Sequence, residues 1–319
     1  MAPWVQRAFV LGAGVGKRLR PLTDELPKPL VPIYGKPLMS LCFDHLMAAG
    51  VREFVVNTHH CAKAYRETFG VEPIFYKGNR VHFVHEPILL DTGGGLKNVE
   101  CFFRGGAFFL HNGDILADLD LVELAKFHWE SGSEVTLGLR CDGGPRQVMC
   151  RQEDGRVVDI RGRLGGTEGQ SYVYSGVAVL SPTVFDFLMP GVVESVVEAW
   201  LRMIVAGRKV LGRVMEGRFW ADVGTVGSYF RVHRELAQRG LSYEGDLSEW
   251  PLKLDPTAEL EAGCRVEGFS VVGFGARVGA AAILKDSIVW PEADVMPGIE
   301  LEGCVVRKRA SRSAKYEIL

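Results

Sequence analysis

An apolar side chain recurs at every sixth position near the end of this chain, and few folds accept that spacing. The series runs Leu260, Val266, Val272, Val278, Leu284, Trp290 and Met296. A hexapeptide period is typical of a β-helix, in which each repeat forms one short strand of a coil. We therefore expect about two and a half coils of about 18 residues each.

Residues 8 to 240 follow a different pattern, in which short apolar strands alternate with amphipathic helices. The expected strands cover 8–11, 53–58, 82–85, 107–110, 134–140, 173–180 and 219–223, and 147–160 is expected as a hairpin that turns at Asp154-Gly155. The expected helices cover 37–50, 61–69, 120–129, 194–206 and 228–238. Such alternation predicts an open α/β sheet with helices on both faces and a ligand crevice beyond the carboxyl ends of the strands.

A glycine-rich loop follows the first of these strands. It reads Leu11-Gly12-Ala13-Gly14-Val15-Gly16-Lys17-Arg18, and two further cations, Arg20 and Lys28, come shortly after it. Glycines let backbone N–H groups approach phosphate oxygens, and the cations offset phosphate charge. A Walker A loop is excluded because three residues separate Gly12 from Gly16 and Arg18 follows Lys17. A dinucleotide fingerprint is excluded because Lys17 stands where its third glycine should be. The loop therefore suits a polyphosphate of another kind.

Two acidic residues stand where apolar strands end. Asp114 follows the strand at 107–110, and Asp222 lies within the strand at 219–223. An acid at the carboxyl end of a buried strand lies where a magnesium-bound phosphate would sit. A Gly-Asp pair alone is also a turn signal, but together with the glycine loop the two acids predict a metal and phosphate site. A further segment, Thr92-Gly93-Gly94-Gly95, is expected as a loop before a helix, and by itself a flexible turn is its first interpretation.

The stretch from Leu11 to Thr23, followed by Pro27-Lys28-Pro29-Leu30, resembles the signature of sugar-1-phosphate nucleotidylyltransferases, the NDP-sugar pyrophosphorylases. Gly12 and Lys17 depart from the usual form of that signature. The resemblance covers about residues 7 to 240. It implies an α/β, Rossmann-like domain with a mostly parallel sheet, here followed by a short left-handed β-helix. The Thr-Gly-Gly-Gly segment looks most like N-acetylmuramate-1-phosphate uridylyltransferases and some guanylyltransferases of mannose or heptose phosphates, which leaves the nucleobase undecided.

The resemblance also implies a reaction and its residues. A sugar 1-phosphate would attack the α-phosphorus of a nucleoside triphosphate and expel pyrophosphate. Arg18 would clamp the outer phosphates, Lys28 would sit between the two reacting phosphates, and Asp114 and Asp222 would hold Mg²⁺. The implied nucleotide-binding residues are Leu11, Gly12, Ala13, Gly14, Gly16, Lys17, Arg18, Glu86, Thr92, Gly93, Gly94 and Asn112.

The sugar side of the site is less well matched. Tyr174, Ser175 and Gly176 correspond to the Thr-Gly segment of the family, with serine in place of threonine. The usual Glu-Lys-Pro before it is missing, so we expect Arg161 or Arg163 to supply the cation for the sugar phosphate. A solvated hairpin is the alternative for these two arginines.

Composition limits the remaining possibilities. A formal net charge of −2 gives no reason to expect nucleic acid or a membrane as a partner. The lack of an apolar run of about 20 residues, of a signal peptide and of a CxxC motif predicts a cytoplasmic protein. No histidine follows residue 241, which argues against an acyltransferase β-helix. A non-catalytic regulatory subunit is a second alternative.

The expected division is a catalytic domain over 1–240, a linker over 241–255, the β-helix over 256–305 and a basic tail over 306–319. A homo-oligomer formed through the β-helix is also expected.

Overall fold

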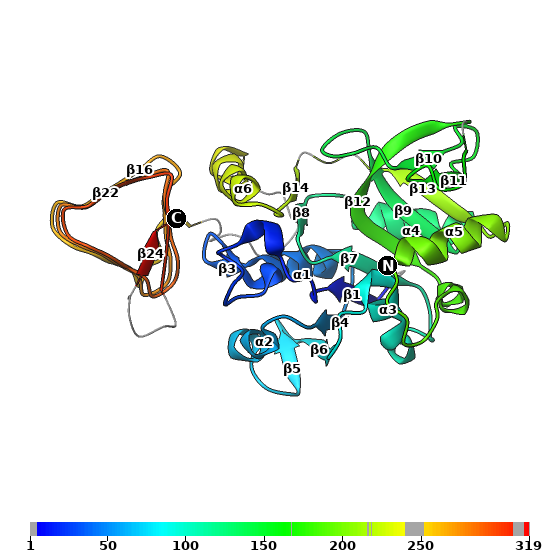
Figure 1. Cartoon of the computed structure of the whole chain (residues 1–319), viewed down its shortest axis with the longest axis horizontal. Coiled ribbons are helices and arrows are strands. Elements are labelled where there is room, and N and C mark those ends of the chain that lie inside the picture. Colours follow the sequence, from blue (N-terminus) through cyan, green and yellow to red (C-terminus); the bar gives the residue numbers. More distant parts are fainter. Residues whose placement is uncertain are drawn as a thin grey trace.

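The computed structural model describes residues 5–166, 168–215, 217, 219–239, 252–308 and 316–318. Most of the expected linker, residues 241–251, and residues 309–315 of the expected basic tail lie outside the described residues. The described chain forms a mixed α/β body with a stack of short strands at one side of it (Figure 1). None of its described helices is both long enough and apolar enough to span a bilayer.

A ten-stranded sheet forms the centre of the α/β body. Its order is β11-β10-β12-β7-β1-β4-β6-β5, and β9 pairs with both β12 and β13. The strands are β1 (Arg7–Leu11), β4 (Glu53–Thr58), β5 (Ile74–Tyr76), β6 (Asn79–His85), β7 (Phe108–Asn112), β9 (Val135–Arg140), β10 (Val148–Cys150), β11 (Val157–Ile160), β12 (Gln170–Leu180) and β13 (Val210–Val214). The neighbours β7, β1, β4 and β6 are parallel, which confirms the expected α/β sheet, whereas β12 runs antiparallel to β7.

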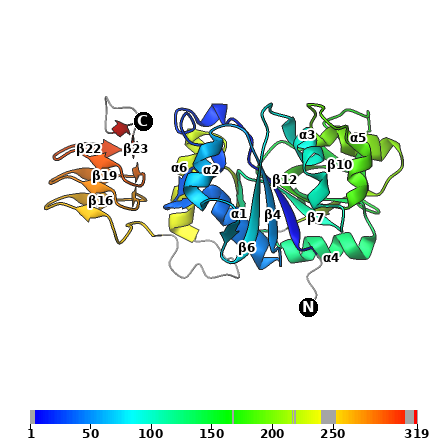
Figure 2. The ribbon, with the colours of Figure 1, turned by 90° about the horizontal axis from the view of Figure 1, so that it is seen from below.

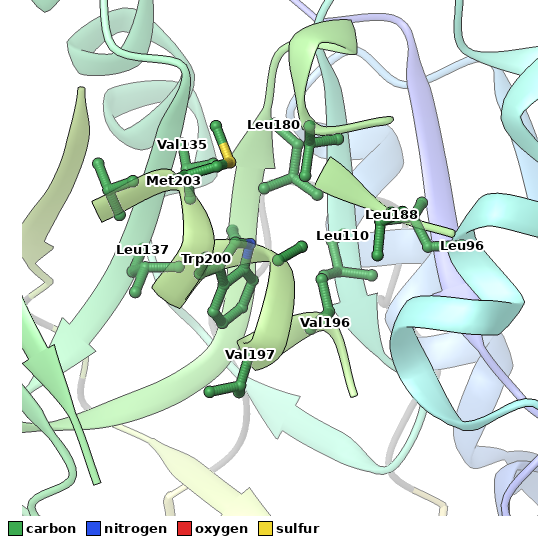
Figure 3. Packing of buried hydrophobic residues seen from close by; sticks show 14 of the residues in the cluster. Leu96, Leu110, Val135, Leu137, Leu180, Leu188, Val196, Val197, Trp200 and Met203 are labelled. Atoms are coloured by element: carbon green, nitrogen blue, oxygen red, sulfur yellow. The ribbon is translucent and has the colours of Figure 1, made fainter. Parts of the chain in front are cut away.

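Helices cover both faces of this sheet, as the alternation predicts. They are α1 (Leu38–Ala48), α2 (Ala62–Phe69), α3 (Asp91–Asn98), α4 (Leu121–Ser131) and α5 (Val196–Val205), whereas α6 (Val226–Arg239) packs in a separate cluster that it shares with the β-helix. Neighbouring strand residues point to opposite faces, so Phe9 belongs to the cluster under α3 and α5 and Val10 to the cluster under α1 and α4. Figure 3 shows the first cluster, in which Trp200 of α5 lies against Leu137 of the sheet.

Short elements connect these layers. They are the 3₁₀ turns η1 (Lys17–Leu19), η2 (Lys28–Leu30), η3 (Glu100–Phe102) and η4 (Pro182–Phe187), and the strand pairs β2 (Pro32–Ile33) with β3 (Lys36–Pro37) and β8 (Ile115–Ala117) with β14 (Trp220–Asp222). The pairing of β14 with β8 places Asp222 opposite Ile115. Asp222 is thereby brought beside Asp114, although more than 100 residues separate them in the chain.

The strands at the end of the chain stack as a β-helix, as the six-residue period predicts (Figure 1). Its three parallel sheets are β15-β18-β21, β16-β19-β22 and β17-β20-β23, and β24 joins the last sheet antiparallel to β23. The strands are β15 (Glu259–Leu260), β16 (Arg265–Glu267), β17 (Val271–Val272), β18 (Arg277–Val278), β19 (Ile283–Lys285), β20 (Ile288–Val289), β21 (Asp294–Val295), β22 (Glu300–Glu302), β23 (Val305–Lys308) and β24 (Tyr316–Ile318).

The members of the six-residue series do not all point into the β-helix, since Leu260 in its first strand is exposed and the last two members also lie outside the core. Val272, Val278 and Leu284 lie in the core of the β-helix, but the next core residues are Val289 and Val295 rather than Trp290 and Met296. The register explains the change, since Arg265 pairs with Ile283 whereas Val271 pairs with Ile288, one residue sooner. The turn after Leu284 is thus one residue shorter, and it moves Trp290 out of the core of the β-helix and into a cluster shared with α6.

Candidate active site

A cavity of about 480 Å³ opens at the carboxyl ends of β1, β4 and β7. It is lined by Leu11, Ala13, Gly14, Lys28, Pro29, Asn57, Leu89, Asp91, Thr92, Asn112, Asp114 and Val193. Seven of these were predicted as site residues from the sequence: Leu11, Ala13, Gly14, Lys28, Thr92, Asn112 and Asp114. The cavity therefore lies where the strand order and the glycine loop place it, between the signature loop and the start of α3.

Each glycine of the signature loop is required for a different structural reason. A Cβ on Gly14 would meet nothing within 4 Å, so its exposed backbone is open to a ligand. Gly12 is packed instead, because a Cβ there would lie 2.7 Å from the carbonyl oxygen of Asn57 and 2.8 Å from Val56. Gly16 has a φ of 64° and begins η1, a backbone conformation that favours glycine. The departure at Gly12 thus has a packing cause.

Lys28 lies between the two predicted acids. Its Nζ is 2.5 Å from Oδ2 of Asp114 and 3.2 Å from Oδ1 of Asp222. The Lys28 side chain is only 9% exposed, whereas Asp114 and Asp222 keep 31% and 40% of their side chains open to solvent. Arg18 reaches to 3.9 Å from Asp222 and is largely exposed. The structure therefore brings together the four residues predicted to carry the chemistry, and of these Lys28 and Asp114 line the cavity.

The two carboxylates also fit a magnesium ion. Among the described residues there is no group of three or more His, Cys, Asp or Glu that could hold a metal. Mg²⁺ does not need one, because it is commonly held by one or two carboxylates together with substrate phosphates and water. Asp114 and Asp222 present oxygens toward one cationic group, Lys28, so their placement suits a second cation brought in with phosphates.

Asn57 lines the cavity, and together with the buried Glu86 it connects the loops around the site. Asn57, at the end of β4, accepts a hydrogen bond from the N–H of Gly12 at 2.9 Å and donates one to Glu86 at 2.8 Å. The other carboxylate oxygen of Glu86 accepts from the N–H of Leu90 at 3.1 Å, and Glu86 is fully buried. Asn57 was not predicted, although a polar residue that ends a buried strand beside the loop is a usable signal. Glu86 joins the signature loop to the start of α3.

The segment Thr92-Gly93-Gly94-Gly95 was expected as a loop, and this expectation is wrong. It forms the first turns of α3, and its N–H groups are already used: Gly93 and Gly94 donate to the carbonyl of Glu194 at 2.8 and 3.1 Å. A Cβ on Gly94 would lie 2.3 Å from the carbonyl oxygen of Val192. The glycines are therefore required because the segment 188–195 packs directly on the helix and carries Val193 to the cavity wall.

The residues predicted for the sugar side lie outside the lining of this cavity. Ser175 is fully buried, its carbonyl accepting from the indole N–H of Trp220 at 2.7 Å, and Tyr174 packs edge-on against Trp200. Gly176 has a φ of 86°, and a Cβ there would meet Ile115 at 2.6 Å. These three residues therefore pack against Trp220, Trp200 and Ile115.

The two arginines expected near the sugar phosphate take separate places. Arg163 forms an ion pair with Glu198 of α5 at 2.9 Å. Arg161 donates to Gln147 at 3.1 Å and lines a smaller hollow of about 280 Å³ together with Arg146. The main cavity thus lacks both of them in its lining.

A neutral layer lies beneath the charged centre. His111 precedes Asn112 in β7, and burial lowers the pKa of its imidazole to about 3. Burial also raises the pKa of the Cys42 thiol, whose Sγ is 3.1 Å from Nδ1 of His111. Both groups are uncharged near neutral pH, so this pair adds no charge beside Asp114.

A glycine loop, a lysine between two carboxylates and a cavity at the switch of an α/β sheet define a protein that binds and transfers phosphorylated nucleotides. Residues 7–239 match the family described as Nucleotidyl transferase, and the chain belongs to that family of sugar-1-phosphate nucleotidyltransferases, enzymes of class EC 2.7.7.

Similar proteins include the mannose-1-phosphate guanylyltransferase of Mycobacterium tuberculosis, which is 30% identical over 309 residues and aligns with 94% of this chain and 83% of its own. The N-acetylmuramate alpha-1-phosphate uridylyltransferase of Neisseria meningitidis serogroup B is 30% identical over 226 residues, 69% of this chain and 94% of its own. The UTP–glucose-1-phosphate uridylyltransferase of a Synechocystis species is 24% identical over 334 residues, 92% of this chain and 85% of its own.

Proposed function

We propose that this enzyme joins a nucleoside triphosphate to a sugar 1-phosphate and releases pyrophosphate, with UTP or GTP as the nucleotide. The sugar is N-acetylmuramate, mannose, heptose or glucose 1-phosphate. The observation that carries the proposal is the position of Lys28, which is 2.5 Å from Asp114 and 3.2 Å from Asp222 and lines the same cavity as Asp114 and the open backbone of Gly14. Relatives named for both nucleotides support either choice.

The reaction needs positioning and charge stabilisation more than a protein nucleophile. The attacking oxygen belongs to a phosphate that is already ionised near neutral pH, so no general base is required. The Gly14 backbone admits the triphosphate, and the exposed Arg18 guanidinium is long enough to follow its outer phosphates. Lys28 stabilises the negative charge that gathers on the α-phosphate as the new bond forms and pyrophosphate leaves. Asp114 and Asp222 would hold Mg²⁺, which supplies further charge neutralisation on the phosphates when bound.

We assign the transfer reaction to residues 1–240 and treat 256–305 as a structural domain joined to it by the linker 241–255, with a basic tail over 306–319. The nucleotide is held by the signature loop together with Thr92 and Asn112. Tyr174, Ser175, Gly176, Arg161 and Arg163 remain the proposed sugar side, which would require the hairpin of β10 and β11 to approach the cavity. A homo-oligomer formed through the β-helix is part of the same proposal.

The test is pyrophosphate release from a matrix of UTP, GTP, CTP and dTTP against glucose, mannose, heptose and N-acetylmuramate 1-phosphates, each with Mg²⁺. We expect one pair to exceed the others clearly, and we expect chelation of Mg²⁺ to abolish the release. The absence of release from every pair, with a folded protein, would support the regulatory-subunit alternative instead.

A further inference from the structure

Helix α6 lies between the β-helix and the loops of the active site (Figure 2). One buried apolar cluster includes residues of all three parts. Val31 and Ile33 come from the segment after Lys28, Tyr229 comes from α6, and Ile288 and Trp290 come from the β-helix. The β-helix is therefore packed into the catalytic body rather than merely tethered to it.

A path of buried hydrogen bonds crosses this cluster. The indole Nε1 of Trp290 donates to the hydroxyl of Tyr229 at 3.0 Å, and that hydroxyl donates to the carbonyl of Pro32 at 2.7 Å. Tyr229 is fully buried and Trp290 is 9% exposed, so water does not compete freely for these bonds. His233, one turn further along α6, accepts from the N–H of Tyr34 at 3.3 Å. Helix α6 thus holds the segment 32–34 through two of its side chains.

The anchored segment 32–34 comes shortly after the proposed catalytic residue Lys28. Lys28 begins η2, a single turn closed by the bond from the Val31 N–H to the Lys28 carbonyl at 3.2 Å, and Pro32 follows directly. On its other side, α6 begins at Val226, shortly after Asp222. Lys28 and one of its two carboxylate partners therefore both lie on short segments fixed at α6. A shift of the Tyr229 hydroxyl would therefore move Pro32 and, through the short turn η2, the backbone of Lys28.

We infer that Trp290 of the β-helix is a positioning residue for the transfer reaction. It holds the Tyr229 hydroxyl, which holds the Pro32 carbonyl, and this contact fixes Lys28 between Asp114 and Asp222. This inference rests on the proposed function. It also gives a role to the shortened turn after Leu284, since that turn aims Trp290 at Tyr229 instead of into the core of the β-helix.

The kinetic test compares Trp290→Phe, Tyr229→Phe and the double variant in the full chain, with Phe274→Ala as the control. Phe274 is an exposed aromatic residue of the same β-helix. Phenylalanine keeps an aromatic ring in the cluster at both positions. At Tyr229 it removes only the hydroxyl, and at Trp290 it removes the N–H together with part of the indole ring. We expect Trp290→Phe to lower kcat about 3- to 10-fold, the scale of one buried hydrogen bond, with KM for both substrates within about twofold. Because Trp290 acts through Tyr229, the Trp290→Phe change should have no further effect in the Tyr229→Phe background.

Hydrogen exchange of the backbone amides in segment 27–38 gives a second readout that needs no substrate. It should become faster in Trp290→Phe and in Tyr229→Phe and stay unchanged in Phe274→Ala. If no substrate pair reacts, the proposed function fails and the exchange result alone decides the coupling. Unchanged exchange together with unchanged kcat in Trp290→Phe would overturn the inference. A full additional loss in the double variant would also overturn it, because the effect would then bypass Tyr229. If Trp290→Phe does not fold, Tyr229→Phe is judged by the same two readouts.

Discussion

Replacing Gly94 by alanine is the sharpest test of why three glycines open α3. The added Cβ would lie 2.3 Å from the carbonyl oxygen of Val192 and 3.0 Å from Cβ of Leu90, well inside normal contact. The segment 188–195 must therefore move by about 1 Å, and overpacking of this kind costs about 1–3 kcal/mol. The movement also weakens the hydrogen bonds from the Gly93 and Gly94 N–H groups to the Glu194 carbonyl, which together contribute about 1 kcal/mol to stability. The higher helix propensity of alanine offsets up to about 1 kcal/mol of this loss.

The net expectation is a loss of about 1–3 kcal/mol in the free energy of unfolding. A rise of about 2- to 5-fold in KM for the nucleotide is also expected, because Val193 is carried on the segment that moves. Urea unfolding and pyrophosphate release measure the two effects. The matched control is Gly227→Ala in α6, where the nearest atom, Oγ1 of Thr225, is 4.0 Å from the new Cβ. That control should be neutral or stabilised by up to about 1 kcal/mol. A Gly94→Ala enzyme as stable as wild type, with unchanged KM, would refute the packing explanation.

Three further outcomes are expected. Lys28→Ala should lower turnover at least about 100-fold, since it removes the cation between the reacting phosphates, and near-normal pyrophosphate release would contradict its role. Burial lowers the pKa of His128 to about 4 from an unfolded value near 6.5, so the unfolded chain binds more protons and stability falls as pH drops from 6.5 to about 4. Urea unfolding across this range should show that the free energy of unfolding of His128→Asn falls less steeply with decreasing pH than that of the wild type, by up to about 1.4 kcal/mol per pH unit. A slope equal to that of the wild type would contradict this assignment. Ser287→Ala should destabilise the β-helix by about 1–2 kcal/mol without changing KM, because the buried Ser287 hydroxyl accepts from the N–H of Cys304 at 3.1 Å. A thermal midpoint equal to that of wild type would count against this estimate.

The parts of the fold that depend on local patterning were predictable. The strand Glu53–Thr58 was predicted with its observed bounds, and the helix expected over 37–50 forms as Leu38–Ala48. Both are long, strongly patterned segments, for which periodicity alone is a strong signal. Strand β8, only three residues long, was not predicted, because its partner strand β14 is remote in sequence and the pairing depends on tertiary contacts.

The site residues depend on tertiary contacts in a different way. Glu86 and Gly94 are predicted to bind the nucleotide because their segment resembles a binding loop, and the structure shows in addition that Glu86 accepts from Asn57 and that Gly94 packs against Val192. Asn57 was missed for the converse reason, since a single asparagine ending a strand carries no motif. Its value comes only from the two hydrogen bonds that connect Gly12 to Glu86.

The break in the repeat at Trp290 is more instructive, because the sequence itself signals it. Ile288 and Val289 form an apolar pair one residue ahead of the expected position, as Val271 and Val272 do in the preceding coil. If the pair Ile288-Val289 is aligned with Val271-Val272, Val289 points into the β-helix and Trp290 faces outward. A large aromatic side chain with a polar N–H is seldom left in water, and a buried indole N–H requires an acceptor. An outward Trp290 thus predicts a docking partner with a hydroxyl or carbonyl, and the Tyr229 hydroxyl fits that requirement at 3.0 Å. A break in a structural repeat can therefore mark the place where the repeat meets the rest of the molecule.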